Sequence, residues 1–252
     1  EAIEQAEVEG LRVLNVTPHA QKLRTGHLRG NRFRIRLRGL PAEGLPLVKR
    51  VLDQIEHEGL PNYFGEQRFG RSGDNAEEAL HWIRDGARAP RNRFQRKLLV
   101  SALQSQLFNE RVAERVRSRT LGTVFQGDLM QKHDSGGMFV ASDVQEAQDR
   151  ADRFEISPTG PMFGAKMRWP EDQARTTEEA LLASLGLSQA HLSAVQRFGA
   201  GTRRFVRVRP SQITLSPVQD GAWLEFALPA GSYATVVVRE ILKRDARSAK
   251  TG

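Results

Sequence analysis

Residues 59–70 read Gly-Leu-Pro-Asn-Tyr-Phe-Gly-Glu-Gln-Arg-Phe-Gly, and the interpretation of the whole chain starts from this stretch. Its mixture of glycine, aromatic and polar residues is typical of neither a regular helix nor a strand. Pro61 fixes its own φ and favours an extended Leu60, while the glycines permit backbone conformations that other residues avoid. We therefore expect a constrained loop that holds three aromatic rings and the guanidinium of Arg68. From these residues alone, the loop is an ordinary buried turn, because aromatic residues between glycines usually fill a core.

The composition is that of a globular protein with a polyanionic partner. The chain has 252 residues, of which 39% are hydrophobic, enough for a packed core in one or two domains. It contains 38 Lys and Arg residues against 30 Asp and Glu residues, a formal charge of +8, which favours a nucleic acid as partner. The sequence has no cysteine, which excludes disulfides and thiolate metal sites and fits a reducing, cytoplasmic location. No apolar run approaches the roughly 20 residues of a membrane helix, so we expect no membrane association.

Alternating patterns predict strands toward both ends of the chain. In residues 32–38, Arg-Phe-Arg-Ile-Arg-Leu-Arg, apolar residues alternate with arginines at the two-residue period of a half-buried strand. The arginines form either a solvated face or a rim that binds phosphate through bidentate guanidinium contacts. Residues 212–218 and 223–228 predict a hairpin around a turn at 219–221, and residues 203–209 predict a further strand.

The middle of the chain is mainly helical in pattern. Apolar spacing predicts helices at residues 47–58, 75–85, 98–116, 142–152, 177–185 and 188–198, with a valine-rich one within 229–240. Short strands are expected at 124–130 and 138–141, and the stretch 157–164, rich in proline and glycine, is interpreted as a rigid loop. We reject His133 and Asp134 as a catalytic pair or metal site, because adjacent residues in a glycine-rich turn usually point apart.

Three further segments change the interpretation of residues 59–70. They read Lys-Leu-Arg-x-Gly-His-Leu-x-Gly-Asn-x-Phe at 22–33, Ser-Pro-Thr-Gly-Pro-Met-Phe-Gly at 157–164 and Pro-Ala-Gly-Ser-Tyr-Ala-Thr at 229–235. With residues 59–70 they resemble, in the same order, the signatures of the TruD family of tRNA pseudouridine synthases. Because the four segments extend along nearly the whole chain, the chain is identified as a member of that family.

The resemblance implies an α+β fold with a V shape. In the family, a sheet-based catalytic domain shared with other pseudouridine synthases carries an inserted α/β TRUD domain. We place a partial, discontinuous catalytic domain at residues 1–57 and 206–252 and the inserted domain at residues 58–205. The resemblance also implies isomerisation of uridine to pseudouridine at position 13 of tRNA, without metal or organic cofactor. The expected partner is tRNA, and the expected state is a monomer.

The resemblance assigns three residues to the uridine pocket: Asn31, Phe33 and Tyr233. An amide matches the donors and acceptors on the edge of uracil, and aromatic rings stack on its face. Without the resemblance, Asn31 is a turn residue after Gly30, Phe33 is a core residue, and Tyr233 packs at a helix start.

Four basic residues are expected to contact RNA. Lys22, Arg24 and Arg29 lie in the loop that leads into Asn31, which is punctuated by glycines, and Arg68 lies in the stretch 59–70. Contacts to phosphate add salt dependence to binding rather than selectivity.

The catalytic carboxylate of the family is the Asp of a motif that resembles Gly-x-Lys-Asp-x-x-Ala-x-Thr, and no Asp in this chain stands in that context. In the family the motif precedes the segment at 22–33, so we expect it upstream of Glu1, in an N-terminal part that is missing here. A carboxylate suits the reaction because it can attack carbon and leave again, or abstract a proton. The chain alone is therefore expected to bind RNA weakly and to be inactive. The alternative function is a non-catalytic RNA-binding module that uses the basic loop and the arginine strand.

Overall fold

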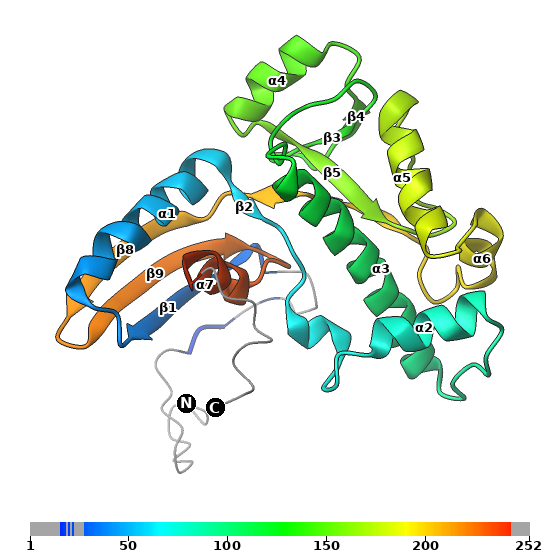
Figure 1. The fold of residues 1–252 in the computed structure, drawn as a ribbon, viewed down its shortest axis with the longest axis horizontal. Helices are drawn as coiled ribbons and strands as arrows, with labels where there is room; N and C mark the ends of the chain where they lie inside the picture. The colour runs from blue at the N-terminus through cyan, green and yellow to red at the C-terminus, as the bar shows by residue number, and fades with distance from the viewer. Residues whose placement is uncertain (1–15, 19, 21, 23–27, 243–252) are drawn as a thin grey trace.

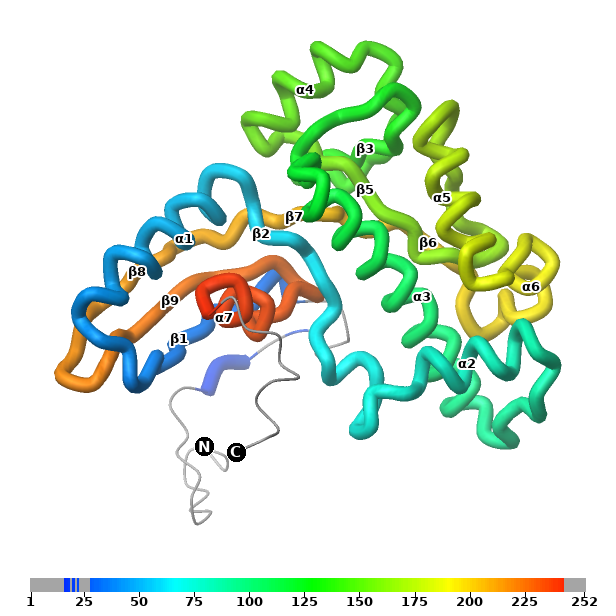
Figure 2. The backbone as a smooth tube through the Cα atoms, in the orientation of Figure 1, coloured from blue at the N-terminus to red at the C-terminus, as the bar shows by residue number. Residues whose placement is uncertain are grey.

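The structure, a computed structural model, describes residues 16–18, 20, 22 and 28–242. Figure 1 shows two arms that diverge from a common junction. One arm is built from both ends of the described chain, and the other from its middle. The chain passes between the arms through β2 (Leu60–Pro61) and β7 (Arg207–Val208), which pair antiparallel at the junction (Figure 2).

The first arm is a three-stranded antiparallel sheet with two helices on one face. Its strand order is β1 (Gly30–Arg38), β9 (Gly221–Pro229) and β8 (Ser211–Val218), so the predicted strand at 32–38 and the predicted hairpin are confirmed and lie in one sheet. The strand predicted at 203–209 is divided between two other sheets, as β6 (Thr202–Phe205) and β7. The helices α1 (Leu45–Glu58) and α7 (Ala234–Leu242) cover the sheet, and the 3-10 turn η1 (Ala42–Gly44) leads into α1.

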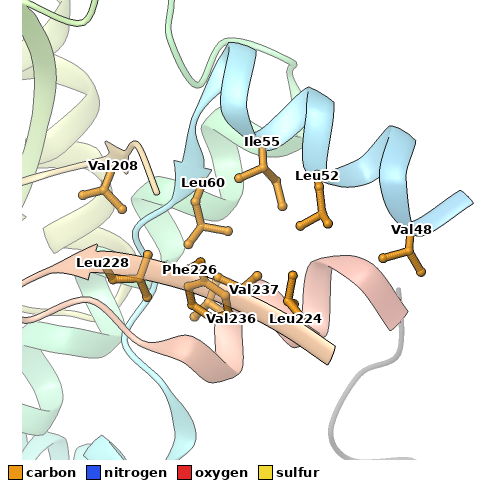
Figure 3. Packing of buried hydrophobic residues seen from close by; sticks show 10 residues of the cluster. All are labelled: Val48, Leu52, Ile55, Leu60, Val208, Leu224, Phe226, Leu228, Val236 and Val237. Carbon is orange, nitrogen blue, oxygen red and sulfur yellow. The ribbon is translucent and has the colours of Figure 1, made fainter. Parts of the chain in front are cut away.

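The core of this arm lies between β9 and the two helices. Figure 3 shows how their apolar side chains meet. The buried members of this cluster are Val48, Leu52, Ile55, Leu60, Val208, Leu224, Phe226, Leu228, Val236 and Val237. Phe33 pairs with Phe226 across β1 and β9, so the apolar residues of β1 face the core and its arginines face away, as the alternation predicts. Each large apolar side chain buried in this way contributes about 1.5–3 kcal/mol.

The second arm is a four-stranded antiparallel sheet packed along one long helix. Its strand order is β4 (Met138–Val140), β3 (Leu129–Lys132), β5 (Ile156–Met162) and β6 (Thr202–Phe205). The helix α3 (Arg93–Arg117) lies along β5, as Figure 1 shows.

Four further helices of the described chain belong to this arm. They are α2 (Asn75–Arg84), α4 (Val144–Asp152), α5 (Asp172–Ser184) and α6 (Gln189–Ala194), of which α2 packs against α3. All the predicted helices are present, but some begin elsewhere. The helix α3 begins at Arg93, earlier than expected, because the side chain of Asn92 accepts a hydrogen bond from the amide of Phe94. Asp143 caps α4 by accepting from the amide of Glu146.

Two expectations for this arm were wrong. The strand expected at 124–130 begins only at Leu129, because residues 125–128 form a turn in which the amide of Asp128 donates to the carbonyl of Phe125 at 3.0 Å. The stretch 157–164 is mostly the buried strand β5 and not a loop. It pairs with β3 through residues 156–158 and with β6 through residues 159–162. Each half is therefore hydrogen-bonded to one neighbouring strand and tolerates prolines as an edge strand does.

The stretch 59–70 is irregular, as expected. After β2 it continues into the 3-10 turn η2 (Glu66–Phe69). Gly59 has a φ of 94° and ends α1, a conformation that glycine adopts without strain. Within the described residues, no helix has the length and apolar character needed to cross a bilayer.

Candidate functional site

The three residues expected in the uridine pocket lie at one end of the first sheet. Asn31 and Phe33 are on β1, and Tyr233 immediately precedes α7. The end of β9 joins them, because Leu228 pairs with Asn31 and the amide of Ala230 donates to the carbonyl of Arg29 at 3.0 Å. Segments from the two ends of the chain therefore meet at this edge of the sheet.

Each of these side chains is accessible. Asn31 is exposed, while Phe33 and Tyr233 are half-buried. The ring of Phe33 stacks on Phe226 with centroids 5.5 Å apart, and Tyr233 meets the ring of Phe64 edge to face at 5.9 Å. Packing thus holds both rings while part of each stays open to solvent. An exposed amide and two held rings at the same end of the sheet have the chemistry needed to bind a flat pyrimidine base.

The ring of Phe64 is held in turn by a side chain of α3. Asn109 accepts a hydrogen bond from the amide of Phe64 at 2.8 Å and donates another to its carbonyl at 3.1 Å. Two bonds from one side-chain amide fix the backbone of this residue against the second arm. Phe64 also meets Phe108 edge to face, with centroids 5.5 Å apart.

Arg204, on β6 of the second arm, reaches the loop that carries Tyr233. Its Nη2 donates to Asn62 Oδ1 at 2.6 Å, to the Asn62 carbonyl at 3.2 Å and to the carbonyl of Gly231 at 2.9 Å. Its guanidinium lies 4.2 Å from the centroid of the Phe64 ring, a cation–π contact. The position of the Tyr233 loop is therefore tied directly to the second arm.

Asn62 completes this junction. It is 5% exposed, and its backbone amide donates to the carbonyl of Val206 at 2.9 Å. Its Nδ2 donates to the carbonyl of Phe205 at 2.9 Å, and its Oδ1 also accepts from the hydroxyl of Ser232 at 3.2 Å. Since Ser232 is the neighbour of Tyr233, Asn62 connects both arms to the predicted pocket.

Sequence reasoning missed both junction residues. Asn62 lies within the stretch 59–70, and its position between Pro61 and Tyr63 was the sequence feature that could have indicated its role. Arg204 stands in a basic segment with no feature to distinguish it from its neighbours.

The junction carries positive charge next to Tyr233. The pKa of Arg204 is lowered to about 10, mainly by burial; Tyr233 opposes this shift and the nearby Arg68 adds to it. Arg204 therefore stays cationic at neutral pH. Its hydrogen-bond acceptors are neutral oxygens, so its charge is not cancelled by them.

The four basic residues expected to contact RNA have different surroundings. Lys22 and Arg29 are exposed, and Arg24 lies outside the described residues. Arg68 donates from Nε to the hydroxyl of Ser105 at 3.2 Å and from Nη2 to the hydroxyl of Ser101. These bonds fasten η2 to α3. An RNA contact by any of the four remains a prediction.

A cleft of about 820 Å³ lies elsewhere at the junction, between α1, α4 and residues 119–123. Arg207 lines it and donates to the carbonyls of Glu58 at 2.8 Å and Ala151 at 2.6 Å. Burial lowers the pKa of Arg207 to about 10. None of the predicted site residues lines this cleft.

Comparison with known proteins identifies the family. The family described as tRNA pseudouridine synthase D (TruD) matches residues 1–79 and 84–241. The chain belongs to the TruD family. The tRNA pseudouridine synthase D of Anaeromyxobacter sp. (strain Fw109-5) is 43% identical over 243 residues, covering 94% of this chain and 68% of that protein. The tRNA pseudouridine synthase D of Thermus thermophilus is 39% identical over 239 residues, covering 95% of this chain and 65% of that protein.

A solved structure shares the fold. The putative TruD protein of Methanosarcina mazei superposes with a TM-score of 0.74 at 22% identity, covering 96% of this chain and 75% of that one. The α+β fold of the TruD family, expected from the resemblance, is thus confirmed. The roles of Asn31, Phe33 and Tyr233 remain predictions within that fold.

Proposed function

We propose that this protein isomerises uridine to pseudouridine at position 13 of tRNA. The observation that supports this most strongly is membership of the TruD family over nearly the whole chain, with relatives named tRNA pseudouridine synthase D. The convergence of Asn31, Phe33 and Tyr233 at one edge of the sheet supports it independently. The alternative, a non-catalytic RNA-binding module, gains no support from these relatives.

The proposed site matches the needs of the reaction. The bond between base and ribose breaks, the base turns, and it rejoins the ribose through carbon. A uridine within folded tRNA must first leave its stack, at a cost of a few kcal/mol. The rings of Phe33 and Tyr233 would replace the lost stacking, and the amide of Asn31 would bind the edge of the base.

The carboxylate for this reaction is proposed to come from outside these residues. No Asp in the chain stands in a Gly-x-Lys-Asp-x-x-Ala-x-Thr context. The chain spans 68% of the length of its Anaeromyxobacter relative, which leaves room for that motif in the remainder. The chain alone would then lack activity, and the complete site would work without metal or organic cofactor.

We propose that the domain boundaries lie where the chain passes from one arm to the other. The catalytic domain comprises residues 1–57 and 206–252, and the inserted domain comprises residues 58–205. The position of β2 and β7 at the junction supports both limits. We further propose that the protein acts as a monomer in the cytoplasm, where tRNA is modified.

The test compares turnover with affinity. In the protein extended by the N-terminal segment of its relatives, Tyr233→Ala should lower the rate of pseudouridine formation about 5- to 150-fold, since stacking on one ring is worth about 1–3 kcal/mol. Affinity for tRNA should change little, because phosphate contacts dominate it. Tyr233→Phe, which keeps the ring, is the matched control. A loss of affinity with unchanged turnover would favour the binding module instead.

A further inference from the structure

The arginines of β1 form an exposed surface that the proposed pocket does not use. Arg32, Arg34, Arg36 and Arg38 are all exposed and lie on the face of the sheet opposite α1 and α7. Successive residues on one face of a strand are about 6.6–6.8 Å apart, so the four arginine side chains leave the strand in a row at this spacing. We call this row, with its neighbours on β9, the arginine face.

An indole at the centre of the arginine face holds two of these cations. Trp223 pairs with Arg36 across β1 and β9. The guanidinium of Arg34 lies 4.5 Å from the centroid of the Trp223 ring, and that of Arg36 lies 6.0 Å from it. These cation–π contacts keep both groups over the sheet instead of letting them extend freely into water. The face is therefore partly preorganised.

The arginine face keeps an excess of positive charge. Glu225 forms an ion pair with Arg34 at 3.0 Å, and it is the acidic residue of β9 on this face. Arg32 donates to the side chain of Gln212, a neutral acceptor. The side chains of Arg36 and Arg38 make no hydrogen bond or ion pair with another residue in the described part of the chain. Two guanidinium groups are thus available to a ligand.

The chemistry of the arginine face selects a polyanion. An apolar partner would have to bury several charges at a large desolvation cost. A chain of phosphates supplies oxygen pairs that the guanidinium fork binds with two parallel hydrogen bonds. The hydroxyls of Thr214 and Ser216, on β8 beside Glu225 and Trp223, add neutral donors to the same face.

We propose that the arginine face binds the phosphodiester backbone of the substrate tRNA, outside the nucleotide pocket. This inference rests on the proposed function, which supplies tRNA as the substrate. One strand serves both surfaces, since Asn31 and Phe33 lie on one face of β1 and the arginines on the other. The strand β1 is also the outer strand of this sheet among the described residues, so an RNA strand that leaves the pocket can pass over its edge.

The test removes the two available arginines. In the protein with Arg36→Gln and Arg38→Gln, binding of a tRNA transcript is followed by fluorescence anisotropy over a series of salt concentrations. Each lost phosphate contact reduces the slope of log affinity against log salt by about 0.7–0.9, so the expected reduction is about 1.4–1.8. The matched control is Lys49→Gln with Arg50→Gln, which removes the same charge from exposed positions of α1 on the opposite side of the sheet. The control slope should stay near that of the unaltered protein.

A second measurement locates the contact. Binding of tRNA should change the fluorescence of Trp223, and Trp223→Phe should abolish that part of the signal while Trp82 and Trp169 remain. Equal slopes in the arginine variant and the unaltered protein, with no Trp223 signal, would overturn the proposal and leave a protein neighbour as the occupant of this face. Pseudouridine formation would then persist, so the proposed function would stand. Failure of the unaltered protein to bind tRNA would contradict both the role of the arginine face and the proposed function.

Discussion

The position of the Tyr233 ring depends on Gly65, which has no side chain. A Cβ added at Gly65 would lie 2.9 Å from the Tyr233 ring and 3.1 Å from the hydroxyl of Thr235. The φ of Gly65 is −74°, which any residue adopts, so this glycine is needed for space and not for conformation. The contact explains in physical terms why a glycine follows Tyr63 and Phe64.

Gly65→Ala should therefore displace Tyr233 without unfolding the protein. We expect a fall in the rate of pseudouridine formation comparable to that of Tyr233→Ala, with tRNA affinity nearly unchanged. The measurement is single-turnover kinetics in the extended protein. Gly137→Ala is the control, since its added Cβ would meet atoms no closer than 3.5 Å. A rate equal to that of the unaltered protein would show that the position of Tyr233 is not critical.

The surroundings of His133 predict how the stability of the protein depends on pH. Burial, aided by Arg207, lowers the pKa of His133, and Asp134 opposes this shift. The ring stacks on Phe205 with centroids 4.3 Å apart, and its Nε2 bonds the hydroxyl of Ser157 at 2.9 Å. This environment favours the neutral imidazole.

Because the folded-state pKa of His133 lies below the unfolded value of about 6.5, the unfolded state binds more protons as the pH falls through that value. Its stabilising effect is complete above about pH 6.5 and is lost progressively below it. Urea unfolding at pH 7.5 and pH 5 should show a smaller loss of stability for His133→Gln than for the unaltered protein. An equal loss in both would mean that other groups control the acid sensitivity.

Some residues of the site could be predicted from the sequence and others could not. Asn31, Phe33 and Tyr233 stand in segments shared with a family, so they could be named. Asn62 and Arg204 act through contacts between the two arms, and such contacts depend on tertiary structure that local pattern does not encode.

At the scale of elements, buried ion pairs hold the second arm together. Arg203 of β6 binds Glu178 of α5 through two hydrogen bonds of 2.7 and 2.8 Å, and both side chains are at most 3% exposed. Arg115 of α3 binds Asp128 through Nη2, which donates to both carboxylate oxygens at 2.8 and 2.7 Å. Each pair joins a helix to the sheet or to the segment that enters it.

Removing one partner of the first pair should be costly. Glu178→Ala leaves the Arg203 charge buried without a counterion, and we expect a loss of about 3–5 kcal/mol in the free energy of unfolding. Denaturant titration measures it. The double change Glu178→Leu with Arg203→Met removes both charges and should recover much of the loss. If the double variant is less stable than the single one, the cost lies in packing and not in the uncompensated charge.

Element boundaries show where sequence patterns fail. The alternation at 32–38 predicted the correct strand because one face is packed and the other is solvated. The stretch 157–164 was misread because its prolines argue against a strand that is buried along its whole length. Only the pairing with β3 on one half and β6 on the other makes those prolines tolerable, and that arrangement is not visible in the local sequence.

At the scale of the whole molecule, the chain makes one sheet from its two ends and places the other sheet between them. The family resemblance implied a discontinuous first domain, and the sequence pattern agreed with it, since a helical middle separates two strand-rich ends. How the arms meet was not predictable. It depends on β2 pairing with β7 and on the hydrogen bonds of Asn62 and Arg204, which link residues far apart in the sequence.

The central claim is that these residues bind the uridine of tRNA while the catalytic carboxylate comes from an upstream segment. The most direct test maps pseudouridine in a tRNA transcript after incubation with residues 1–252, alone and extended by the N-terminal segment of the relatives. We predict no pseudouridine with residues 1–252 alone and conversion at position 13 with the extended protein. Pseudouridine formed by residues 1–252 alone would contradict both the missing carboxylate and the roles assigned to the pocket residues.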